Sequence, residues 1–283
     1  MYLIADGGAT KTDWALVDNH QIKARVFTLG MNPFHASEEA IGNILTNELI
    51  PNLPAEANGA DIYFYGAGCT PEKCIIMKGL LQEAFPKSST IEVMSDLWGA
   101  ARALCGHKPG IACILGTGSN SCYYDGKDMV ANTPPLGYIL GDEGSGAVLG
   151  KLFVADALKG LLPESLTRVF FEETGLTKAD FLDNIYKKPM PSRFLASMAP
   201  FITRHKDEEP MLKELAIRNF RSFFSRCIAP YGHPEMPVNF IGGLAFSYEN
   251  ELKEAARIEG FTIGTIEKGP MDGLIKYHST SEA

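Results

Sequence analysis

Five segments of the chain combine glycines with side chains that could bind or transfer a phosphoryl group. The first, residues 6–13, follows an apolar run and contains two adjacent glycines, two threonines and Lys11. Glycines let backbone N–H groups approach an anion closely, and hydroxyl and ammonium groups add donors, so this segment is typical of a phosphate-binding loop. Asp6, at the end of the apolar run, could orient a hydrated Mg²⁺. An ordinary glycine-rich hairpin is the alternative, because the chain has neither a Walker loop nor a dinucleotide fingerprint here.

Two more glycine-rich segments lie later in the chain. Residues 115–120 read LGTGSN, which places two glycines among three side chains with hydrogen-bond donors. Together with the first loop, this segment indicates two lobes that grip one phosphate chain. Residues 238–243 form an apolar run that ends in a glycine pair, where a flat ring or a ribose could lie close to the backbone. A tight turn explains this glycine pair about equally well.

Carboxylates mark the remaining two segments. Asp96 follows a predicted strand and precedes a predicted helix, so it could cap that helix, accept the proton of a substrate hydroxyl during phosphoryl transfer, or do both. Asp142 and Glu143 are adjacent, lie between glycines, and open another predicted helix. We expect helix capping to use one of these two carboxylates, and a ligand hydroxyl or a metal-bound water to use the other.

Alternating strand-like and helix-like stretches must position these segments. Strands separated by helical patterns indicate an α/β architecture. After a polar break at residues 106–110, the order of strand, glycine turn and strand repeats, so we expect two lobes of similar build. Residues 145–231 are predicted to be mostly helical. The predicted strands are 2–5, 14–18, 21–29, 61–65, 90–94, 111–115, 121–124, 238–241 and 261–266, and the other predicted helices are 37–49, 71–85, 97–104, 249–259 and 271–277.

The composition limits the function classes. The 283 residues include 26 Lys or Arg and 34 Asp or Glu, so the formal net charge is −8, which argues against a nucleic-acid or anionic-membrane partner. Hydrophobic residues make up 45% of the chain, enough to build the cores of about two domains. We find no secretory signal and no apolar run of membrane-spanning length, and the six cysteines form no C-x-x-C pair. These features predict a cytoplasmic protein with free thiols.

In this order, the five segments resemble the sugar kinase–actin–Hsp70 ATPase (ASKHA) superfamily. The resemblance is closest to the N-acetylglucosamine kinase branch, which is grouped with the BadF/BadG/BcrA/BcrD-type ATPases. It covers nearly the whole chain, and residues 7–12 and 141–145 are its most specific pieces. The resemblance implies two ribonuclease-H-like (actin-like ATPase) α/β lobes with an interlobe cleft. Residues 1–108 would form the first lobe, residues 109–270 the second, and residues 271–283 a helix that returns to the first lobe.

The resemblance also implies roles for single residues. Asp96 matches the catalytic base. Asp6 matches the first residue of the first phosphate loop, where we expect its carboxylate to orient Mg²⁺. Gly242 and Gly243 match the adenosine motif. The residues that match phosphate-binding positions are Gly7, Gly8, Ala9, Thr10, Lys11, Gly116, Thr117, Gly118 and Ser119. The residues that match the sugar site are Asn32, the turn Gly66, Ala67 and Gly68, and Gly137 and Asp142.

These roles imply an ATP- and Mg²⁺-dependent kinase that phosphorylates the 6-hydroxyl of an amino sugar. N-acetylglucosamine is the amino sugar that the resemblance favours. One position departs from the family, which often carries an aromatic-containing turn before the Gly-Asp-Glu-Gly motif. Here residues 133–137 place Leu136 in that turn, and leucine cannot stack on a sugar as an aromatic ring does. The family resemblance further implies a homodimer. No zinc is expected, because the compact cysteine cluster of the related repressor/kinase family is missing.

Two other functions fit parts of the pattern. An ATPase that activates a partner reductase or dehydratase would keep this fold but carry cysteine ligands for an iron–sulfur cluster. Cys113 precedes the second glycine loop, but it lies inside an apolar run, where a buried thiol is favoured over a ligand, so no iron–sulfur cluster is expected. A sugar sensor without phosphotransfer chemistry is disfavoured by Asp6, Asp96 and Asp142, which are all retained.

Overall fold

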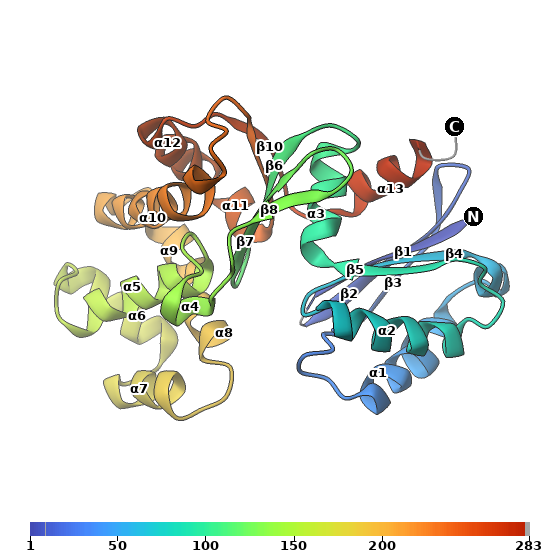
Figure 1. Ribbon diagram of the computed structural model, residues 1–283. Helices are drawn as coiled ribbons and strands as arrows, with labels where there is room; N and C mark the ends of the chain where they lie inside the picture. Colours follow the sequence, from blue (N-terminus) through green and yellow to red (C-terminus); the bar gives the residue numbers. More distant parts are fainter. Residues whose placement is uncertain (9, 281–283) are drawn as a thin grey trace. The chain divides into compact units, whose positions relative to one another are not determined.

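The computed structural model describes residues 1–8 and 10–280, and the chain divides into two compact units (Figure 1). Unit 1 contains Met1–Pro109, Tyr124–Met129 and the segment from Gly269 onward. Unit 2 contains Gly110–Tyr123 and Val130–Lys268. Each unit is built on its own β-sheet with helices packed against it, so each has its own core.

Unit 1 has a five-stranded sheet with the order β3-β2-β1-β4-β5. The first three strands form an antiparallel meander, whereas β4 is parallel to β1 and β5 is parallel to β4. The carboxyl ends of β1, β4 and β5 therefore lie at one edge of the sheet, where ligands commonly bind in α/β folds. The strands are β1 (Tyr2–Gly7), β2 (Lys11–Asp18), β3 (Gln21–Leu29), β4 (Asp61–Gly66) and β5 (Ile91–Ser95).

Helices cover both faces of this sheet. Because side chains alternate along a strand, Leu3 and Ala5 pack into one buried cluster while Tyr2 and Ile4 pack into another. The first cluster lies under α1 and α2, and the second includes residues of α13, the last helix. The helices of unit 1 are α1 (Glu38–Ile44), which continues as a π-helical turn (Leu45–Leu49) and a 3₁₀ turn (Ile50–Asn52), a second 3₁₀ turn (Ala55–Gly59), α2 (Pro71–Ala84), α3 (Asp96–Cys105) and α13 (Met271–Thr280).

Unit 2 has a second five-stranded sheet with the order β10-β9-β6-β7-β8, in which β6, β9 and β10 are parallel. Its core is rich in phenylalanine contributed by several helices and by β9. The strands are β6 (Gly110–Leu115), β7 (Ser119–Tyr124), β8 (Met129–Asn132), β9 (Val238–Ile241) and β10 (Ile263–Glu267). The helices are α4 (Gly137–Leu140), α5 (Gly146–Leu158), α6 (Glu164–Thr174), α7 (Lys178–Tyr186), α8 (Pro191–Ala196), α9 (Ala199–His205), α10 (Pro210–Phe223), a π-helical turn (Phe224–Ile228), a 3₁₀ turn (Ala229–Tyr231), α11 (Gly243–Ser247) and α12 (Glu249–Glu259).

The predicted α/β class is confirmed, and most predicted elements are found within two residues of their expected ends. β3, β9 and α12 have the predicted bounds. The predicted cap Ser37 accepts a hydrogen bond from the Ala40 N–H at 3.2 Å, but the α-helix that it starts changes to a π-helical turn after Ile44. Strand β8 and helix α4 are short and were not predicted. Among the described residues, no helix is long and apolar enough to cross a membrane.

Candidate active site

Three neighbouring strand ends in unit 1 form the base of the candidate site. The strand register places Gly7 beside Gly66, and Gly66 beside Ser95. The backbone N–H of Ala67 donates to the Gly7 carbonyl at 2.7 Å, which ties the predicted sugar turn to the first glycine loop. Asp96 directly follows Ser95. The sheet therefore brings the predicted catalytic base, the predicted sugar turn and the first phosphate loop to one edge.

Three carboxylates are concentrated at this edge. Asp13 lies directly opposite Asp6 in the β1–β2 pair, an arrangement of like charges that destabilises a hairpin. Burial raises the pKa of Asp6 to about 7, with a further rise from the charges of Asp13 and Asp96 and an opposing effect of Lys11. Arg25 donates two hydrogen bonds to Asp13, at 3.0 and 2.6 Å, and so compensates one of the charges. Because Mg²⁺ keeps most of its waters and needs few protein carboxylates, this uncompensated negative charge fits a hydrated Mg²⁺ held through Asp6.

Asp96 is the first residue of α3, and Ser95 occupies the N-cap position. The expectation that Asp96 caps a helix beginning at Leu97 is therefore wrong by one residue. The Asp96 carboxylate instead accepts a hydrogen bond from the Leu97 N–H at 2.9 Å, which fixes one oxygen. Burial raises the pKa of Asp96, and the backbone hydrogen bonds oppose that rise. A carboxylate that is partly desolvated and held by the backbone is suited to accept a proton.

The predicted sugar residues of unit 1 lie together. Gly68 has a φ of +74°, and a Cβ on it would lie 2.1 Å from Asn32 Oδ1, so only glycine lets the turn approach the Asn32 amide this closely. Cys69 follows the turn, and a Cβ on Gly66 would lie 2.8 Å from its sulfur. Burial raises the pKa of the Cys69 thiol to about 12, and the charge of Asp96 contributes to that rise. The turn and Asn32 thus adjoin the predicted base.

The first glycine loop connects β1 and β2. Its backbone closes through the Gly8 N–H, which donates to the Lys11 carbonyl at 2.9 Å. Thr10 and Lys11 are exposed, and the Lys11 ammonium lies 4.8 Å from the centroid of the Phe27 ring. Ala9, also predicted to bind phosphate, lies outside the described residues. The loop leaves an exposed hydroxyl and an ammonium for an anionic ligand.

The second glycine loop belongs to unit 2 and is held by the start of α5. The Gly116 N–H donates to the Gly118 carbonyl at 3.0 Å, which makes the tight turn between β6 and β7. The N–H groups of Gly146 and Ala147 donate to the carbonyls of Gly116 and Thr117, at 2.9 and 3.1 Å. The first turn of α5 thus holds the second glycine loop directly, so the position of the loop depends on that helix.

Asp142 packs against this second loop. Its backbone has a φ of +54°, and a Cβ on Gly118 would lie 3.1 Å from its carboxylate. Burial raises the pKa of Asp142, while the backbone amides of Ser119 and Gly137 oppose the shift. The predicted sugar residue Asp142 therefore meets the predicted phosphate residues Gly118 and Ser119 within unit 2, and the Gly137 amide donates to the same carboxylate.

The prediction that one carboxylate of the Asp142–Glu143 pair caps the following helix is wrong. Ser145 caps α5, since its hydroxyl accepts from the Val148 N–H at 3.1 Å. Glu143 instead forms an ion pair with Arg226 at 2.6 Å. Serine is as good an N-cap as aspartate, and it lies nearest to the start of the helix, so it takes the position.

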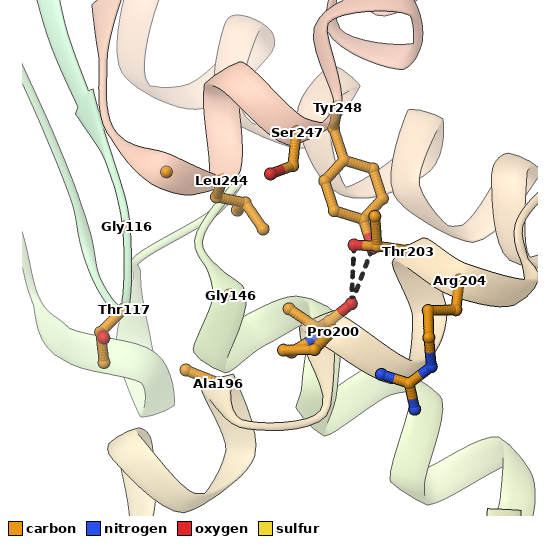
Figure 2. Close-up of a pocket in the computed structure, with 12 residues that line it drawn as sticks. Gly116, Thr117, Gly146, Ala196, Pro200, Thr203, Arg204, Leu244, Ser247 and Tyr248 are labelled. Carbon is orange, nitrogen blue, oxygen red and sulfur yellow. Dashed lines mark hydrogen bonds between the residues drawn. The ribbon is translucent and has the colours of Figure 1, made fainter. Parts of the chain in front are cut away.

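A pocket of about 520 Å³ opens beside the second glycine loop, entirely within unit 2 (Figure 2). The loop and the start of α5 form one side, α8 and α9 form a second, and α11 forms a third. Of the predicted residues, Gly116, Thr117 and Gly243 line it. The other lining residues are Gly146, Ala196, Ala199, Pro200, Thr203, Arg204, Leu244, Ser247 and Tyr248.

The two glycines of the predicted adenosine motif differ in what they do. Gly242 has a φ of +133°, and a Cβ on it would lie 2.2 Å from the Leu115 carbonyl oxygen, so glycine is required there by the fold. A Cβ on Gly243 would meet no atom within 4 Å. Gly243 therefore faces open space at the pocket, whereas Gly242 shapes the turn that leads to it.

Sequence reasoning missed the wall made by α8 and α9. Ala196 ends α8, and Pro200 and Thr203 belong to α9, in a stretch that the sequence marks only as helical and that gives no sign of a ligand. Over residues 1–8 and 10–280, no group of three or more His, Cys, Asp or Glu side chains is arranged to hold a metal ion. A hydrated Mg²⁺ that is also bound by phosphates does not require such a group.

Several solved structures are similar to this chain. The putative N-acetylglucosamine kinase from Porphyromonas gingivalis aligns with a TM-score of 0.96 and 46% sequence identity, and the alignment covers 100% of both chains. The putative N-acetylglucosamine kinase from Chromobacterium violaceum aligns with a TM-score of 0.77 and 20% identity over 98% of this chain and 99% of that one. A ROK family glucokinase from Streptomyces griseus, in complex with glucose and AMPPNP, aligns with a TM-score of 0.56 and 15% identity over 98% of this chain and 97% of that one.

The two more distant structures establish the fold alone, while the first, with nearly half of its residues identical over its full length, establishes the family. No protein-family model matches the sequence, and no match was found among the curated proteins. The segments that carry the resemblance lie at strand ends and glycine turns in both units. The chain belongs to the N-acetylglucosamine kinase and BadF/BadG/BcrA/BcrD-type ATPase family of the ASKHA superfamily.

Proposed function

We propose that the protein is an ATP-dependent sugar kinase that phosphorylates the 6-hydroxyl of N-acetylglucosamine. The observation that carries this proposal is the strand edge of unit 1, where Asp6, Asp96 and the turn beside Asn32 are gathered. Phosphoryl transfer to an alcohol needs a proton acceptor, a carboxylate suited to a hydrated cation and a polar turn suited to a small ligand.

We assign the nucleotide to the pocket of unit 2. The glycine loop, Gly116 to Ser119, would offer backbone N–H groups and hydroxyls to the phosphates, because glycines leave room for close approach. The base would lie farther along the pocket, between α9 and α11, where apolar side chains form the walls. Lys11 and Thr10 of the first loop are exposed and would add an ammonium and a hydroxyl to the phosphate ligands.

We assign the sugar and the proton transfer to unit 1. Asn32 and the backbone of Gly66–Gly68 would orient the sugar, and Asp96 would accept the proton of the 6-hydroxyl as that oxygen attacks the γ-phosphorus. Asp142 in unit 2 is assigned to a sugar hydroxyl. Mg²⁺, when bound through water to Asp6, would neutralise charge on the phosphates.

A coupled ADP-release assay over a panel of sugars tests this proposal. We expect turnover with N-acetylglucosamine to exceed that with glucose, glucosamine and N-acetylmannosamine. The matched control is 6-deoxy-N-acetylglucosamine, which lacks the acceptor oxygen and must give no ADP above the rate without sugar. Equal ADP release with and without every sugar would contradict a sugar kinase.

The alternative function, an ATPase that activates a reductase or dehydratase, requires ligands for an iron–sulfur cluster. Cys113 is fully buried in β6, within the strand that leads to the glycine loop, so its sulfur is placed for packing. An iron–sulfur chromophore in anaerobically purified protein would favour that alternative. The homodimer is likewise a proposal, and sedimentation of the purified chain would test it.

A further inference from the structure

An asparagine on α10 bridges the turn that leads into α5. Asn219 is buried, with only 2% of its surface exposed, and its side-chain amide meets two consecutive residues of the turn. The Gly144 N–H donates to Asn219 Oδ1 at 3.0 Å, and Asn219 Nδ2 donates to the Ser145 carbonyl at 3.1 Å. A side-chain amide has both an acceptor and a donor, so it can satisfy an N–H and a carbonyl at the same time. One side chain from a distant helix thus holds the middle of this turn.

Helix α10 also packs against the turn through a second residue. Gly144 has a φ of +78°, and a Cβ on it would lie 2.8 Å from Phe223 Cβ. Phe223 follows Asn219 by four residues and is fully buried, so the two side chains lie on the same face of α10. The turn is therefore held by both packing and hydrogen bonds from one face of this helix.

The turn needs this support because part of its backbone is strained. Asp142 has a φ of +54°, in the left-handed region that is unfavourable for a residue with a Cβ. Its carbonyl accepts from the Ser145 N–H at 3.0 Å, which closes the turn. Such a conformation persists only where the surrounding structure fixes it. The ion pair between Glu143 and the exposed Arg226 contributes little, so the buried amide of Asn219 is the firmer anchor.

Both ends of the turn belong to the candidate site. At its start, the Asp142 carboxylate accepts from the backbone amides of Ser119 and Gly137. At its end, the N–H groups of the first two residues of α5 donate to carbonyls of the second glycine loop. A shift of the turn would therefore move the carboxylate assigned to the sugar and the loop assigned to the phosphates together. Asn219 itself has almost no exposed surface, so it would contact neither ligand.

We propose that Asn219 is a positioning residue, whose amide holds residues 142–145 and thereby sets Asp142 and the second glycine loop for the two substrates. This inference rests on the proposed kinase function, which it deepens by adding a residue that acts on both substrates without touching either. The catalytic base and the residue for Mg²⁺ are assigned to unit 1. Asn219 should therefore govern binding and have little effect on the chemical step.

Asn219→Asp tests the bridge with almost no change in shape. One carboxylate oxygen can still accept from the Gly144 N–H, but the other faces the Ser145 carbonyl without a proton, so these two oxygens repel. We expect the KM for N-acetylglucosamine and the Kd of ATP each to rise by about tenfold, because a buried polar group that loses its partner carries a penalty of this order. At saturating substrates, kcat should fall by less than about threefold. Coupled ADP release and titration calorimetry with ATP would measure these quantities.

Asn239→Asp is the matched control in the same unit. Asn239 on β9 is also buried, its Nδ2 donates to the Ile111 carbonyl at 3.1 Å, and its Oδ1 accepts from the Thr265 N–H at 2.9 Å. Ile111 lies near the start of β6, at the opposite end of that strand from the glycine loop. This variant should unfold at lower urea concentration, as Asn219→Asp should, but keep the KM and the Kd within about twofold.

A purely structural role for Asn219 predicts a different result. A variant that is less stable but still folded at the assay temperature would keep both constants. If Asn219→Asp does not fold, Asn219→Ala takes its place, since it introduces no charge and should raise both constants in the same direction. Unchanged KM and Kd in a folded variant at position 219 would overturn the inference, and so would an equal rise in Asn239→Asp.

Combination with Asp142→Asn shows whether the effect on the sugar passes through the Asp142 carboxylate. In that background Asn219→Asp should raise the KM by less than about twofold more, yet still raise the Kd of ATP by about tenfold, because the glycine loop depends on the turn separately. A fully additive rise in KM would overturn the route through Asp142. If the unchanged protein phosphorylates no sugar, the proposed function fails, whereas the ATP titrations still decide whether Asn219 positions the loop.

Discussion

The candidate sites of the two units, the strand edge of unit 1 and the pocket of unit 2, differ in electrostatic character. In unit 1 they are charged: Asp6, Asp13 and Asp96 repel one another at a sheet edge, and burial raises the pKa of Asp6 and Asp96. In unit 2 the pocket is lined by glycines, apolar side chains and hydroxyls, with Arg204 already paired. The contrast suggests a division of labour, because proton transfer needs poised charges whereas binding of a large flat ligand needs a preformed neutral surface. Changes in unit 1 should then appear in kcat, and changes in the pocket should appear in nucleotide affinity.

The sharpest test of this division is Asp96→Asn. The amide keeps an oxygen that can accept from the Leu97 N–H, so α3 should form normally, but it cannot take the proton of the sugar hydroxyl. We expect kcat with N-acetylglucosamine to fall by at least about 10²-fold while the Kd of ATP stays unchanged. Stopped-time assays and nucleotide titrations would measure the two quantities.

The matched control is Asp142→Asn in unit 2, whose carboxylate meets the second glycine loop. It should alter the KM for the sugar more than kcat. If Asp96→Asn keeps normal turnover while Asp142→Asn abolishes it, the catalytic base is Asp142 of unit 2. The proposed division of labour between the two units would then be wrong.

A second test removes the carboxylate assigned to Mg²⁺. Asp6→Asn takes one charge from a crowded group, so the fold should tolerate it, and the relief of repulsion from Asp13 should even favour the β1–β2 pair. We expect the Mg²⁺ concentration for half-maximal activity to rise by roughly 10–100-fold, as is typical when a residue that orients a metal ligand is lost. Titration of activity with Mg²⁺ at saturating ATP would show the shift, and an unchanged midpoint would remove Asp6 from the metal site.

Much of unit 1 could be predicted because its signals are local. Each functional residue there follows an apolar run and accompanies a glycine, so strand ends such as Gly7 and Gly66 were recognisable one by one. Parallel pairing then brings the ends together without further information. The error at Asp96 is one residue, since serine and aspartate are similar caps and Ser95 stands next to it.

Less of the unit 2 pocket was predictable because its walls come from distant parts of the chain. The glycine loop and Gly243 carry a local signal, but Thr203 and Tyr248 acquire their role only when α9 packs beside α11. The partner of Glu143 was missed for the same reason, because Arg226 lies far along the chain and cannot be assigned by spacing.

The glycine pair at the end of β9 offers a test with two different outcomes. Gly243→Val projects its side chain into the open pocket, so we expect ATP affinity to fall by about tenfold with little loss of stability. Gly242→Ala must relieve a contact of 2.2 Å with the Leu115 carbonyl, and we expect it to destabilise the protein by about 1–3 kcal/mol. Denaturant unfolding and ATP titration of both variants would separate the roles, and equal stability losses would contradict the distinction.

The smallest effect that we expect concerns the pH dependence of stability, and it arises in unit 1 away from the carboxylates. His278 on α13 is buried, its Nε2 lies 2.8 Å from the Tyr65 hydroxyl, and its ring stacks on Tyr63. Burial, together with the positive charges of Arg102 and His107, lowers its pKa to about 3. The folded protein therefore keeps this imidazole neutral.

In the unfolded chain the same imidazole would titrate near its ordinary pKa of about 6.5. Between these two pKa values the unfolded state binds a proton at this imidazole and the folded state does not. The free energy of unfolding is therefore highest above about pH 6.5 and decreases as the pH falls toward 3. At pH 5.5 the loss of unfolding free energy should be about 1 kcal/mol.

His278→Gln keeps a polar group near Tyr65 but cannot titrate. The unfolding free energy of this variant should therefore change less between pH 7.5 and 5.5 than that of the unchanged protein, even if it is lower at pH 7.5. His35→Gln, at an exposed position, controls for the loss of one imidazole. Urea midpoints of the three proteins at both pH values decide the matter: parallel changes in all three would mean that protonation of His278 does not contribute to acid destabilisation of unit 1.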